Sequence, residues 1–238
     1  LNQIAQWKHE HPLTYDSTDA VHEEGLTGMD DEPVEPSHKL PLRAQYVIEK
    51  VGEATAGEAY VVTDVGQHQM WAAQWYGFSR PRTMITSGGL GTMGFGLPAA
   101  IGVQMAHPEA DVVVISGDGS IQMNIQEMAT AVACGLPLKI ILLNNGFLGM
   151  VRQWQDLFYD KRYSEVDLRA TNPDFVKLAE AFGAVGLRVF RDEDVVESLA
   201  EAMKIKDRPV LMDFVIAEED NVYPMIPAGA ASHEMIEE

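Results

Sequence analysis

Two apolar runs in the middle of the chain restrict its fold more than any other feature. The sequences DVVVISGDG at 111–119 and LKIILLNN at 138–145 are almost continuous stretches of valine, isoleucine and leucine, and each ends abruptly in glycine, aspartate or asparagine. A strand without alternating polar residues is buried on both faces, which is typical of parallel sheets covered by helices. The two runs therefore predict two interior strands of such a sheet.

Further helix and strand patterns flank these runs. Helices are expected from LRAQYVIEKVGEA, GLPAAIGVQMAH, PDFVKLAEAFG and EDVVESLAEAMK, and shorter strands from AYVVTD, TMITS, GLRVF and PVLMDFVIA. Strands that alternate with helices form parallel sheets. We predict an α/β fold over about 40–217, a doubly wound, mainly parallel sheet with helices on both faces.

Charge and composition exclude several classes of function. The 238 residues carry a formal net charge of −19, concentrated in the acidic stretches 16–35 and 209–238, which argues against nucleic-acid binding. No apolar run approaches the roughly 18 residues of a membrane span, and the polar start LNQIAQWKHEHP is unlike a secretory signal. The single cysteine, Cys134, allows no intrachain disulfide and is expected to be a small buried helix residue in a protein of a reducing compartment.

The first 40 residues differ in composition from the rest. The stretch DSTDAVHEEGLTGMDDEPVEPSHK is acidic, holds two prolines and lacks a sustained apolar period, which is typical of irregular segments. We predict that 1–40 is a linker, an irregular acidic segment that follows a preceding domain, and that 41–238 form one folded domain.

A glycine-rich turn raises the question of which phosphate compound is bound. TSGGLGTMGFG at 86–96 holds a literal G-x-G-x-x-G at Gly89, Gly91 and Gly94, which alone suggests a nicotinamide dinucleotide site. Such a site needs an acidic residue about 20 positions later to bind ribose. The candidate, Asp118, lies between two glycines, which let the backbone approach a ligand closely. A nicotinamide-dependent dehydrogenase is therefore kept only as a less favoured alternative.

Oxygen-bearing side chains end the two interior strands. Asp118 ends the first and Asn145, 27 residues later, ends the second, so neighbouring parallel strands would deliver both to one place. Carboxylate and carboxamide oxygens suit Mg²⁺ or Ca²⁺, and Mg²⁺ completes its shell with phosphate oxygens and water. Ser120 is expected to cap a helix whose N-terminus supplies N–H groups to the phosphates. The pattern predicts a metal-bridged diphosphate clamp, and the alternative is two ordinary turns.

These motifs together resemble one enzyme family. GDGS followed by NN at this spacing resembles the thiamine diphosphate motif of decarboxylases and carboligases. TDVGQHQMWAAQ, SGGLGTMGFGLPAAIG, GDGSIQMN, NNGFLGMVRQWQ and VYPMIPAGA resemble the catalytic subunit of acetohydroxyacid synthase, or acetolactate synthase, over about 42–235. The resemblance implies that 41–238 are the C-terminal, thiamine diphosphate-binding catalytic domain of a three-domain subunit.

The resemblance also implies an activity and its partners. The expected enzyme is a transferase of branched-chain amino acid biosynthesis that decarboxylates pyruvate and joins the product to a second 2-keto acid, such as 2-ketobutyrate. Implied cofactors are thiamine diphosphate, Mg²⁺ and a structural FAD, bound mostly by the preceding domain with Gly88 and Gly89 as contacts. Implied partners are the remaining domains, a second copy in a homodimer or tetramer, and a regulatory small subunit, without nucleic acid or membrane. The expected location is the bacterial cytoplasm, with an organelle as the alternative.

Individual residues acquire roles by the same resemblance. Asp118, Asn145 and the carbonyl of Phe147 would bind the metal. Met93, with Met123 and Met150 as further candidates, would hold the cofactor rings in a bent form, and Trp154 would shape the pocket for the second keto acid. Core packing for the methionines, a core or interface position for Trp154 and a purely structural His68 stay open. The predicted cofactor contacts are Gln67, His68, Gly91, Thr92, Met93, Asp118, Gly119, Ser120, Asn145, Gly146, Phe147, Leu148, Gly149 and Met150.

One catalytic part has no match in this sequence. The family uses a glutamate beside the pyrimidine N1′ of the cofactor, located in the first domain and contributed by a partner subunit, and nothing in 1–238 resembles its motif. We therefore expect the 238-residue chain to bind the cofactor weakly and not to turn over pyruvate alone. The alternatives are another thiamine diphosphate enzyme, such as glyoxylate carboligase or pyruvate oxidase, against which Trp154 speaks, and an inactive cofactor-binding fragment.

Overall fold

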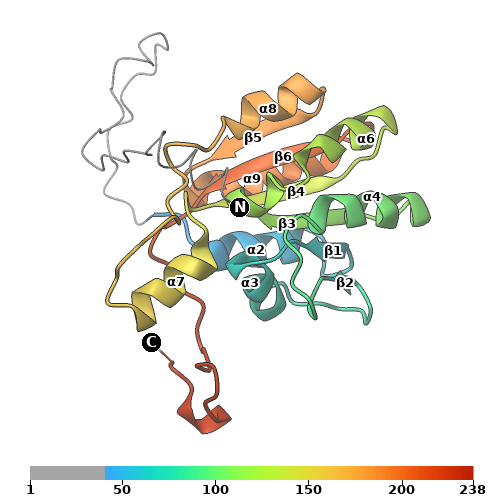
Figure 1. Cartoon of the computed structure of the whole chain (residues 1–238). Coiled ribbons are helices and arrows are strands. Elements are labelled where there is room, and N and C mark those ends of the chain that lie inside the picture. Colours follow the sequence, from blue (N-terminus) through green and yellow to red (C-terminus); the bar gives the residue numbers. More distant parts are fainter. Residues whose placement is uncertain (1–40, 238) are drawn as a thin grey trace, which may run out of the picture. The chain divides into compact units, whose positions relative to one another are not determined.

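A parallel sheet of six strands forms the centre of the structure, a computed structural model that describes residues 41–237. The strand order is β2-β1-β3-β4-β6-β5 and every neighbouring pair is parallel, as Figure 1 shows. The predicted doubly wound α/β fold is thereby confirmed, whereas the predicted linker 1–40 lies outside the described residues. The strands are β1 (Tyr60–Thr63), β2 (Met84–Ile85), β3 (Val112–Gly117), β4 (Lys139–Asn144), β5 (Val185–Val189) and β6 (Val210–Val215).

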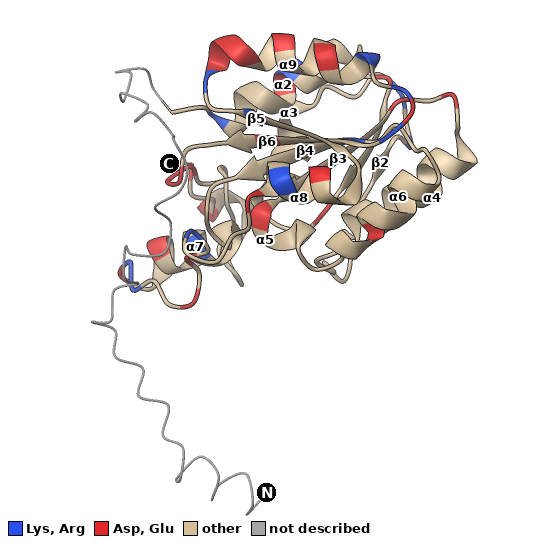
Figure 2. Cartoon of the chain, turned by 90° about the horizontal axis from the view of Figure 1, so that it is seen from above, with Lys and Arg blue, Asp and Glu red and all other residues tan. Residues whose placement is uncertain are grey.

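Helices cover both faces of this sheet (Figure 2). On one face lie α2 (Ala44–Ala54), α3 (Gln67–Trp75) and α9 (Asp192–Lys204), and on the other lie α4 (Gly96–Ala106), α6 (Met128–Ala133) and α8 (Phe175–Phe182). Two further helices, α5 (Asp118–Ile121) and α7 (Gly149–Phe158), follow β3 and β4 directly, and short 3₁₀ turns occupy Ile125–Glu127 and Ser232–Glu234.

The two interior runs are buried as their sequences predict. Val113 and Ile115 of β3 pack with α2, α3 and α9, whereas Val112 and Val114 pack with α4, α6 and α8. All six residues of β3 are buried. Successive side chains of a strand point to opposite faces. Since helices cover both faces of this sheet, both sets of side chains are apolar, and the sequence shows no polar alternation.

Two local expectations need correction. Cys134 is exposed, because it caps the C-terminus of α6 at the surface and does not pack into the core. Ser120 does not cap a helix: Gly117 is the residue before α5, and the Ser120 hydroxyl instead donates to the carbonyl of Val65 at 2.8 Å. The helix α3 was not expected from the sequence either.

Within residues 41–237 no helix has both the length and the apolar character needed to cross a membrane.

Candidate functional site

A pocket opens at the carboxyl ends of the central strands, between β1 and β3, where the direction in which strands are added to the sheet reverses. After β1 the chain adds β2 on one side of it, then crosses to β3 on the other side of β1 and continues outward to β4. Ligands of open α/β sheets bind outside the carboxyl ends of the strands at such a switch point. The pocket lining comes from the segments that follow β1, β3 and β4, together with Met93. The predicted diphosphate clamp therefore coincides with the position that the topology favours.

The structure brings most of the predicted contacts to this pocket. Those that line it are Gln67, His68, Met93, Asp118, Gly119, Ser120, Asn145, Phe147, Leu148, Gly149 and Met150, joined by Val65, Gly66, Trp71, Gly117, Leu143 and Val151, which the sequence interpretation had not assigned. That these residues bind a cofactor stays a prediction.

The other predicted residues lie elsewhere. Gly91 and Thr92 are exposed in the turn before α4 and do not line the pocket, and neither does Gly146, which connects two lining residues. Met123 is 53% exposed and outside the pocket. Trp154 lines a neighbouring hollow.

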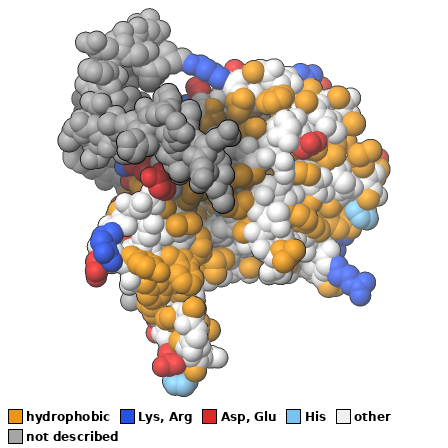
Figure 3. All heavy atoms as spheres, viewed as in Figure 1, with side chains coloured by type: hydrophobic (Ala, Val, Ile, Leu, Met, Phe, Trp, Pro, Cys, Tyr) orange, Lys and Arg blue, Asp and Glu red, His pale blue; other side chains and the backbone are white. Residues whose placement is uncertain are grey.

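The neighbouring hollow adjoins the pocket through a shared residue. Val151 lines both, and the hollow is completed by Trp154, Gln155, Tyr159 and Arg162. Apolar side chains gather around α7 on the face shown in Figure 3. Among the residues of α7, Val151, Trp154 and Phe158 are exposed. Trp154 thus lies beside the main pocket and does not line it, and its expected role in shaping a second-substrate pocket stays a prediction.

Three helices begin at residues that line the pocket. They are α3 at Gln67, α5 at Asp118 and α7 at Gly149. The first N–H groups of a helix have no acceptor within it, and the helix dipole is positive at this end. Such helix starts can donate hydrogen bonds to an anion with several oxygens, and the diphosphate predicted from the sequence stays a prediction here.

Glycines permit the close approach of these segments. A Cβ at Gly117 would lie 2.8 Å from His68 Nδ1, and one at Gly149 would lie 2.1 Å from Gln67 Oε1. Both distances are below any real contact of a Cβ atom. Gly117 and Gly149 thus leave the space that His68 and Gln67 of the β1–α3 segment occupy.

Gly149→Ala is expected to destabilise the chain by about 1–3 kcal/mol, because overpacking forces the buried Gln67 amide from its place. Gln67 would lose hydrogen bonds to Gln153 and Asn145. The matched control is Gly102→Ala in α4, where a Cβ meets nothing within 4 Å and the change should stabilise by up to about 1 kcal/mol. Urea unfolding of the two variants tests this, and equal stabilities would contradict it.

Asp118 is a buried carboxylate at the base of the pocket. Its side chain is 1% exposed, and burial raises its pKa to about 6 although Asn172 donates a hydrogen bond to it. No described group of three or more His, Cys, Asp or Glu side chains could hold a metal. A site with one carboxylate and neutral oxygens matches the way Mg²⁺ is bound together with phosphate, and not a transition-metal site.

Asn145 lies in the same pocket with its amide fixed in orientation. Its Nδ2 donates to Gln67 Oε1 at 3.3 Å, and its Oδ1 accepts the N–H of Phe147 at 3.1 Å. Gln67 is held in turn by Gln153, to whose Oε1 its Nε2 donates at 2.9 Å. The Asn145 oxygen retains a second lone pair for a cation.

The backbone N–H and carbonyl of Phe147 are not used in pairing with the neighbouring segment 166–168. Phe147 pairs with Asp167 in an isolated antiparallel bridge whose hydrogen bonds are made by flanking residues, from Leu148 to Val166 and from Leu168 to Gly146, both at 2.8 Å. The N–H and carbonyl of Phe147 therefore point away from 166–168. Carboxylate, carboxamide and backbone oxygens are the donor types that Mg²⁺ binds, so these residues fit Mg²⁺ by their chemistry.

His68 supplies an unsatisfied polar atom. It is 5% exposed, burial lowers its pKa to about 3, and its Nε2 has no hydrogen-bond partner among the described residues. Buried polar atoms without a partner are rare and call for an explanation such as an absent ligand. A neutral His68 that lines the pocket is suited to bind a ligand oxygen.

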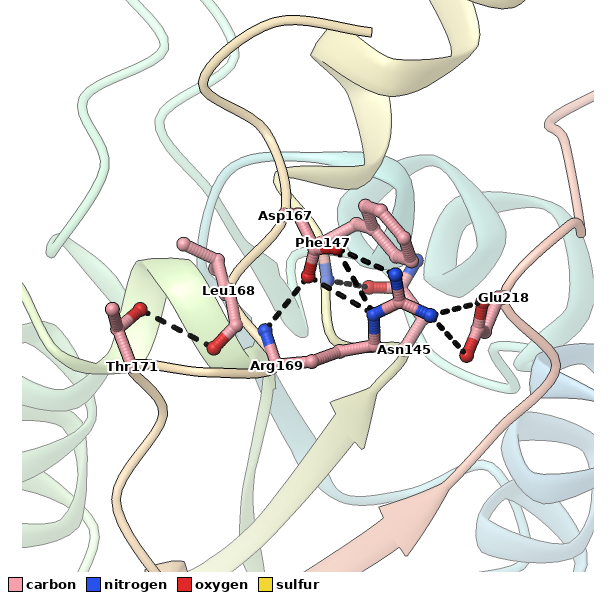
Figure 4. A network of polar contacts seen from close by, with 7 residues as sticks. All are labelled: Asn145, Phe147, Asp167, Leu168, Arg169, Thr171 and Glu218. Carbon is pink, nitrogen blue, oxygen red and sulfur yellow. Dashed lines mark hydrogen bonds and ion pairs between the residues drawn. The ribbon is translucent and has the colours of Figure 1, made fainter. Parts of the chain in front are cut away.

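An arginine that does not line the pocket, Arg169, contacts the loop after β4 (Figure 4). The Arg169 guanidinium lies over the Phe147 ring, 4.8 Å from its centroid. Its Nη2 pairs with Asp167 at 2.5 Å and its Nη1 with Glu218 at 3.2 Å. The sequence interpretation missed this residue, for which no local pattern gave a signal.

A second polar network supports the same loop from the sheet. Asn144 Nδ2 donates to Asp213 Oδ1 at 3.0 Å, and Asn144 Oδ1 accepts the N–H of Gly146 at 3.2 Å. Arg188 donates to the other Asp213 oxygen at 3.0 Å. A signal was present here, since Asp213 and Arg188 interrupt otherwise apolar strand runs.

Comparison with known proteins agrees with this geometry. Residues 64–214 match the family model described as thiamine pyrophosphate enzyme, C-terminal TPP binding domain. The chain is 54% identical over 203 residues to the acetolactate synthase of Mycobacterium leprae, an alignment that covers 84% of this chain and 32% of the relative.

Two further relatives extend over nearly the whole chain. The acetolactate synthase large subunit of Haemophilus influenzae is 47% identical over 98% of this chain and 37% of its own length. The acetolactate synthase isozyme 3 large subunit of Escherichia coli is 45% identical, again over 98% of this chain and 37% of its own length. The resemblance expected from the motifs is confirmed, and the chain spans about a third of the length of the curated relatives it matches.

Proposed function

This chain belongs to the thiamine pyrophosphate (thiamine diphosphate) enzymes, whose C-terminal cofactor-binding domain it matches, and from this premise we propose that it acts as part of an acetolactate synthase. The reaction is the decarboxylation of pyruvate and the joining of the product to a second 2-keto acid, pyruvate or 2-ketobutyrate, in branched-chain amino acid biosynthesis. The observation that carries the proposal is the meeting of Asp118 and Asn145 in one pocket at the starts of α5 and α7.

The pocket residues divide into a diphosphate end and an apolar wall. Asp118, Asn145 and the Phe147 carbonyl would hold Mg²⁺, which offsets the repulsion between the buried Asp118 carboxylate and the diphosphate. Gln67, His68 and the first N–H groups of α3 and α7 would bind the diphosphate oxygens. When bound, thiamine diphosphate supplies the carbon nucleophile and takes up the electron pair left as CO₂ departs.

The apolar wall consists of long flexible and aromatic side chains. Met93, Met150, Leu148 and Trp71 line the pocket, and Met93 is proposed to support the bent cofactor with Met150 beside it. An apolar wall excludes water and disfavours the charged carboxylate of a 2-keto acid, which promotes its loss. Trp154, in the adjoining hollow, is proposed to select the second keto acid.

A carboxylate that could exchange a proton with the cofactor ring would have to come from outside this pocket. Asp118 is the only carboxylate among the described residues that line it, and its proposed role is to bind the metal. We therefore propose that a glutamate from another domain of a partner subunit completes the site, in a homodimer or tetramer with a possible regulatory small subunit, in the bacterial cytoplasm. The exposed apolar side chains around α7 suit such an interface.

FAD has little support from the described residues. Gly88 and Gly89 are exposed and line neither of the two pockets described above. No step is derived through FAD, and its binding by other domains stays a prediction.

Calorimetry and an activity assay test the proposal together. The 238-residue chain is expected to bind thiamine diphosphate only when Mg²⁺ is present, and to form no acetolactate from pyruvate by itself. Cofactor binding that is equal in Mg²⁺ and in chelator would contradict the metal-bridged site. Acetolactate formed by the purified chain alone would contradict the need for a second contributor, and a preference for glyoxylate over pyruvate in the complete enzyme would favour a different carboligase.

A further inference from the structure

Asn172 reaches the predicted metal ligand from a distant part of the chain. Its Nδ2 donates to Asp118 Oδ2 at 2.7 Å. Its Oδ1 accepts a hydrogen bond from Gln122 Nε2 at 3.0 Å, and the same Gln122 nitrogen donates to the Asp118 backbone carbonyl at 2.9 Å. Because Gln122 offers only a donor to Asn172, the amide of Asn172 is fixed with its own donor toward Asp118.

The contact is made from outside the pocket. Asp118 lines the pocket, whereas neither Asn172 nor Gln122 does. Asn172 therefore contacts Oδ2 from a position that does not line the pocket, and within 41–237 it makes the side-chain hydrogen bond to this carboxylate, beside the backbone N–H groups of Asp118 and Gly119. A carboxylate with Oδ2 bound to the Asn172 amide is restricted in its rotation, which limits the direction in which Oδ1 can point.

The segment that carries Asn172 is also attached to the second ligand loop. Leu168 N–H donates to the Gly146 carbonyl at 2.8 Å, and Asn172 N–H donates to the Leu168 carbonyl at 2.7 Å. Segment 166–172 thus bridges the loop after β4 and the start of α5. Displacement of Asn172 would alter the direction of the Asp118 carboxylate relative to Asn145.

We propose that Asn172 is a positioning residue that orients the Asp118 carboxylate for a divalent cation, with Gln122 fixing the amide of Asn172. The inference rests on the proposed function, because the cation is the one that bridges the cofactor diphosphate. Outer partners that hydrogen-bond to metal ligands set the direction of the ligand, and their loss typically weakens metal affinity about 10- to 100-fold.

The test is Mg²⁺ titration of the chain at saturating thiamine diphosphate, followed by calorimetry. Asn172→Ala is expected to raise the Kd for Mg²⁺ about 10- to 100-fold. Asn172→Asp should raise it at least as far, since the new carboxylate has no proton to donate to Asp118. Thr171→Ala is the matched control: Thr171 is the exposed neighbour, its hydroxyl donates to the Leu168 carbonyl at 3.3 Å, and its loss should leave the Kd unchanged.

A second readout separates positioning from a loss of structure. The electron paramagnetic resonance spectrum of bound Mn²⁺ should change in Asn172→Ala and not in Thr171→Ala, while the thermal midpoint of the metal-free chain should stay close to that of the control. If Asn172→Ala does not fold, Gln122→Ala keeps Asn172 and removes the bond that orients it, and should still weaken Mg²⁺ binding.

The outcomes distinguish the two proposals. If the unsubstituted chain shows no Mg²⁺-dependent cofactor binding, the proposed function fails, and the inference fails with it. If that chain binds normally and Asn172→Ala binds Mg²⁺ with the same Kd and the same Mn²⁺ spectrum, the inference alone is overturned.

Discussion

Asp118→Asn is expected to weaken Mg²⁺-dependent binding of thiamine diphosphate by at least about a hundredfold, more than the loss of an outer hydrogen-bond partner. The substitution keeps the size of the side chain and removes the one negative charge that the described pocket residues offer a cation. A neutral amide beside a diphosphate cannot attract Mg²⁺ comparably, because this ion is bound by carboxylates in concert with phosphate. Calorimetric titration with and without Mg²⁺ measures the loss.

A matched control lies at the other end of the same strand. Asp111 immediately precedes β3, and its exposed carboxylate pairs with Lys206 at 2.8 Å. Asp111→Asn changes the net charge by the same amount at the amino end of β3, away from the pocket at its carboxyl end. This variant should leave cofactor binding intact. Equal losses in both variants would mean that total charge, and not a metal ligand, controls binding.

In the metal-free chain, the free energy of unfolding is expected to fall by about 3 kcal/mol between pH 7 and pH 4.5 because of His68. His68→Gln is expected to remove this loss. Burial holds the pKa of His68 near 3 in the folded state, whereas the unfolded side chain titrates near 6.5. Below pH 6.5 the unfolded chain thus binds a proton that the folded chain refuses, and the free energy of unfolding falls by about 1.4 kcal/mol per pH unit. Urea unfolding at both pH values measures the difference between the variant and the unsubstituted chain.

Asp118 contributes with the opposite sign in an overlapping range. Its folded pKa is raised to about 6, so the folded chain takes up a proton before the unfolded chain does, and stability is gained as the pH falls from about 6 to about 4. The two effects partly cancel in the unsubstituted protein, and the differences between variants are the diagnostic quantity. A His68→Gln chain whose pH dependence matches that of the unsubstituted protein would show that His68 is protonated in the fold.

The strand-end motifs were sufficient to anticipate the centre of the site. Asp118 and Asn145 follow β3 and β4, which pair in register with Gly117 opposite Leu143. Because neighbouring parallel strands run in the same direction, their carboxyl ends lie side by side. Two local sequence patterns therefore predicted that residues far apart in the chain lie in one place. Ser120 shows the limit of this reasoning: its position before a helix suggested a cap, and its hydroxyl instead bonds to Val65.

The amino-acid sequence by itself determined the α/β sheet, the burial of its interior strands and the presence of Asp118 and Asn145 in one pocket, because these follow from apolar periodicity and from where each strand stops. Only the tertiary structure decided which side chains hold that pair in place. Asn172 lies 54 residues from Asp118, and Gln153 lies 86 residues from Gln67. Contacts of this kind depend on which connecting segments pack side by side. Strand periodicity does not encode that choice, because the segments are irregular and their hydrogen-bond partners are fixed only once the whole sheet has assembled.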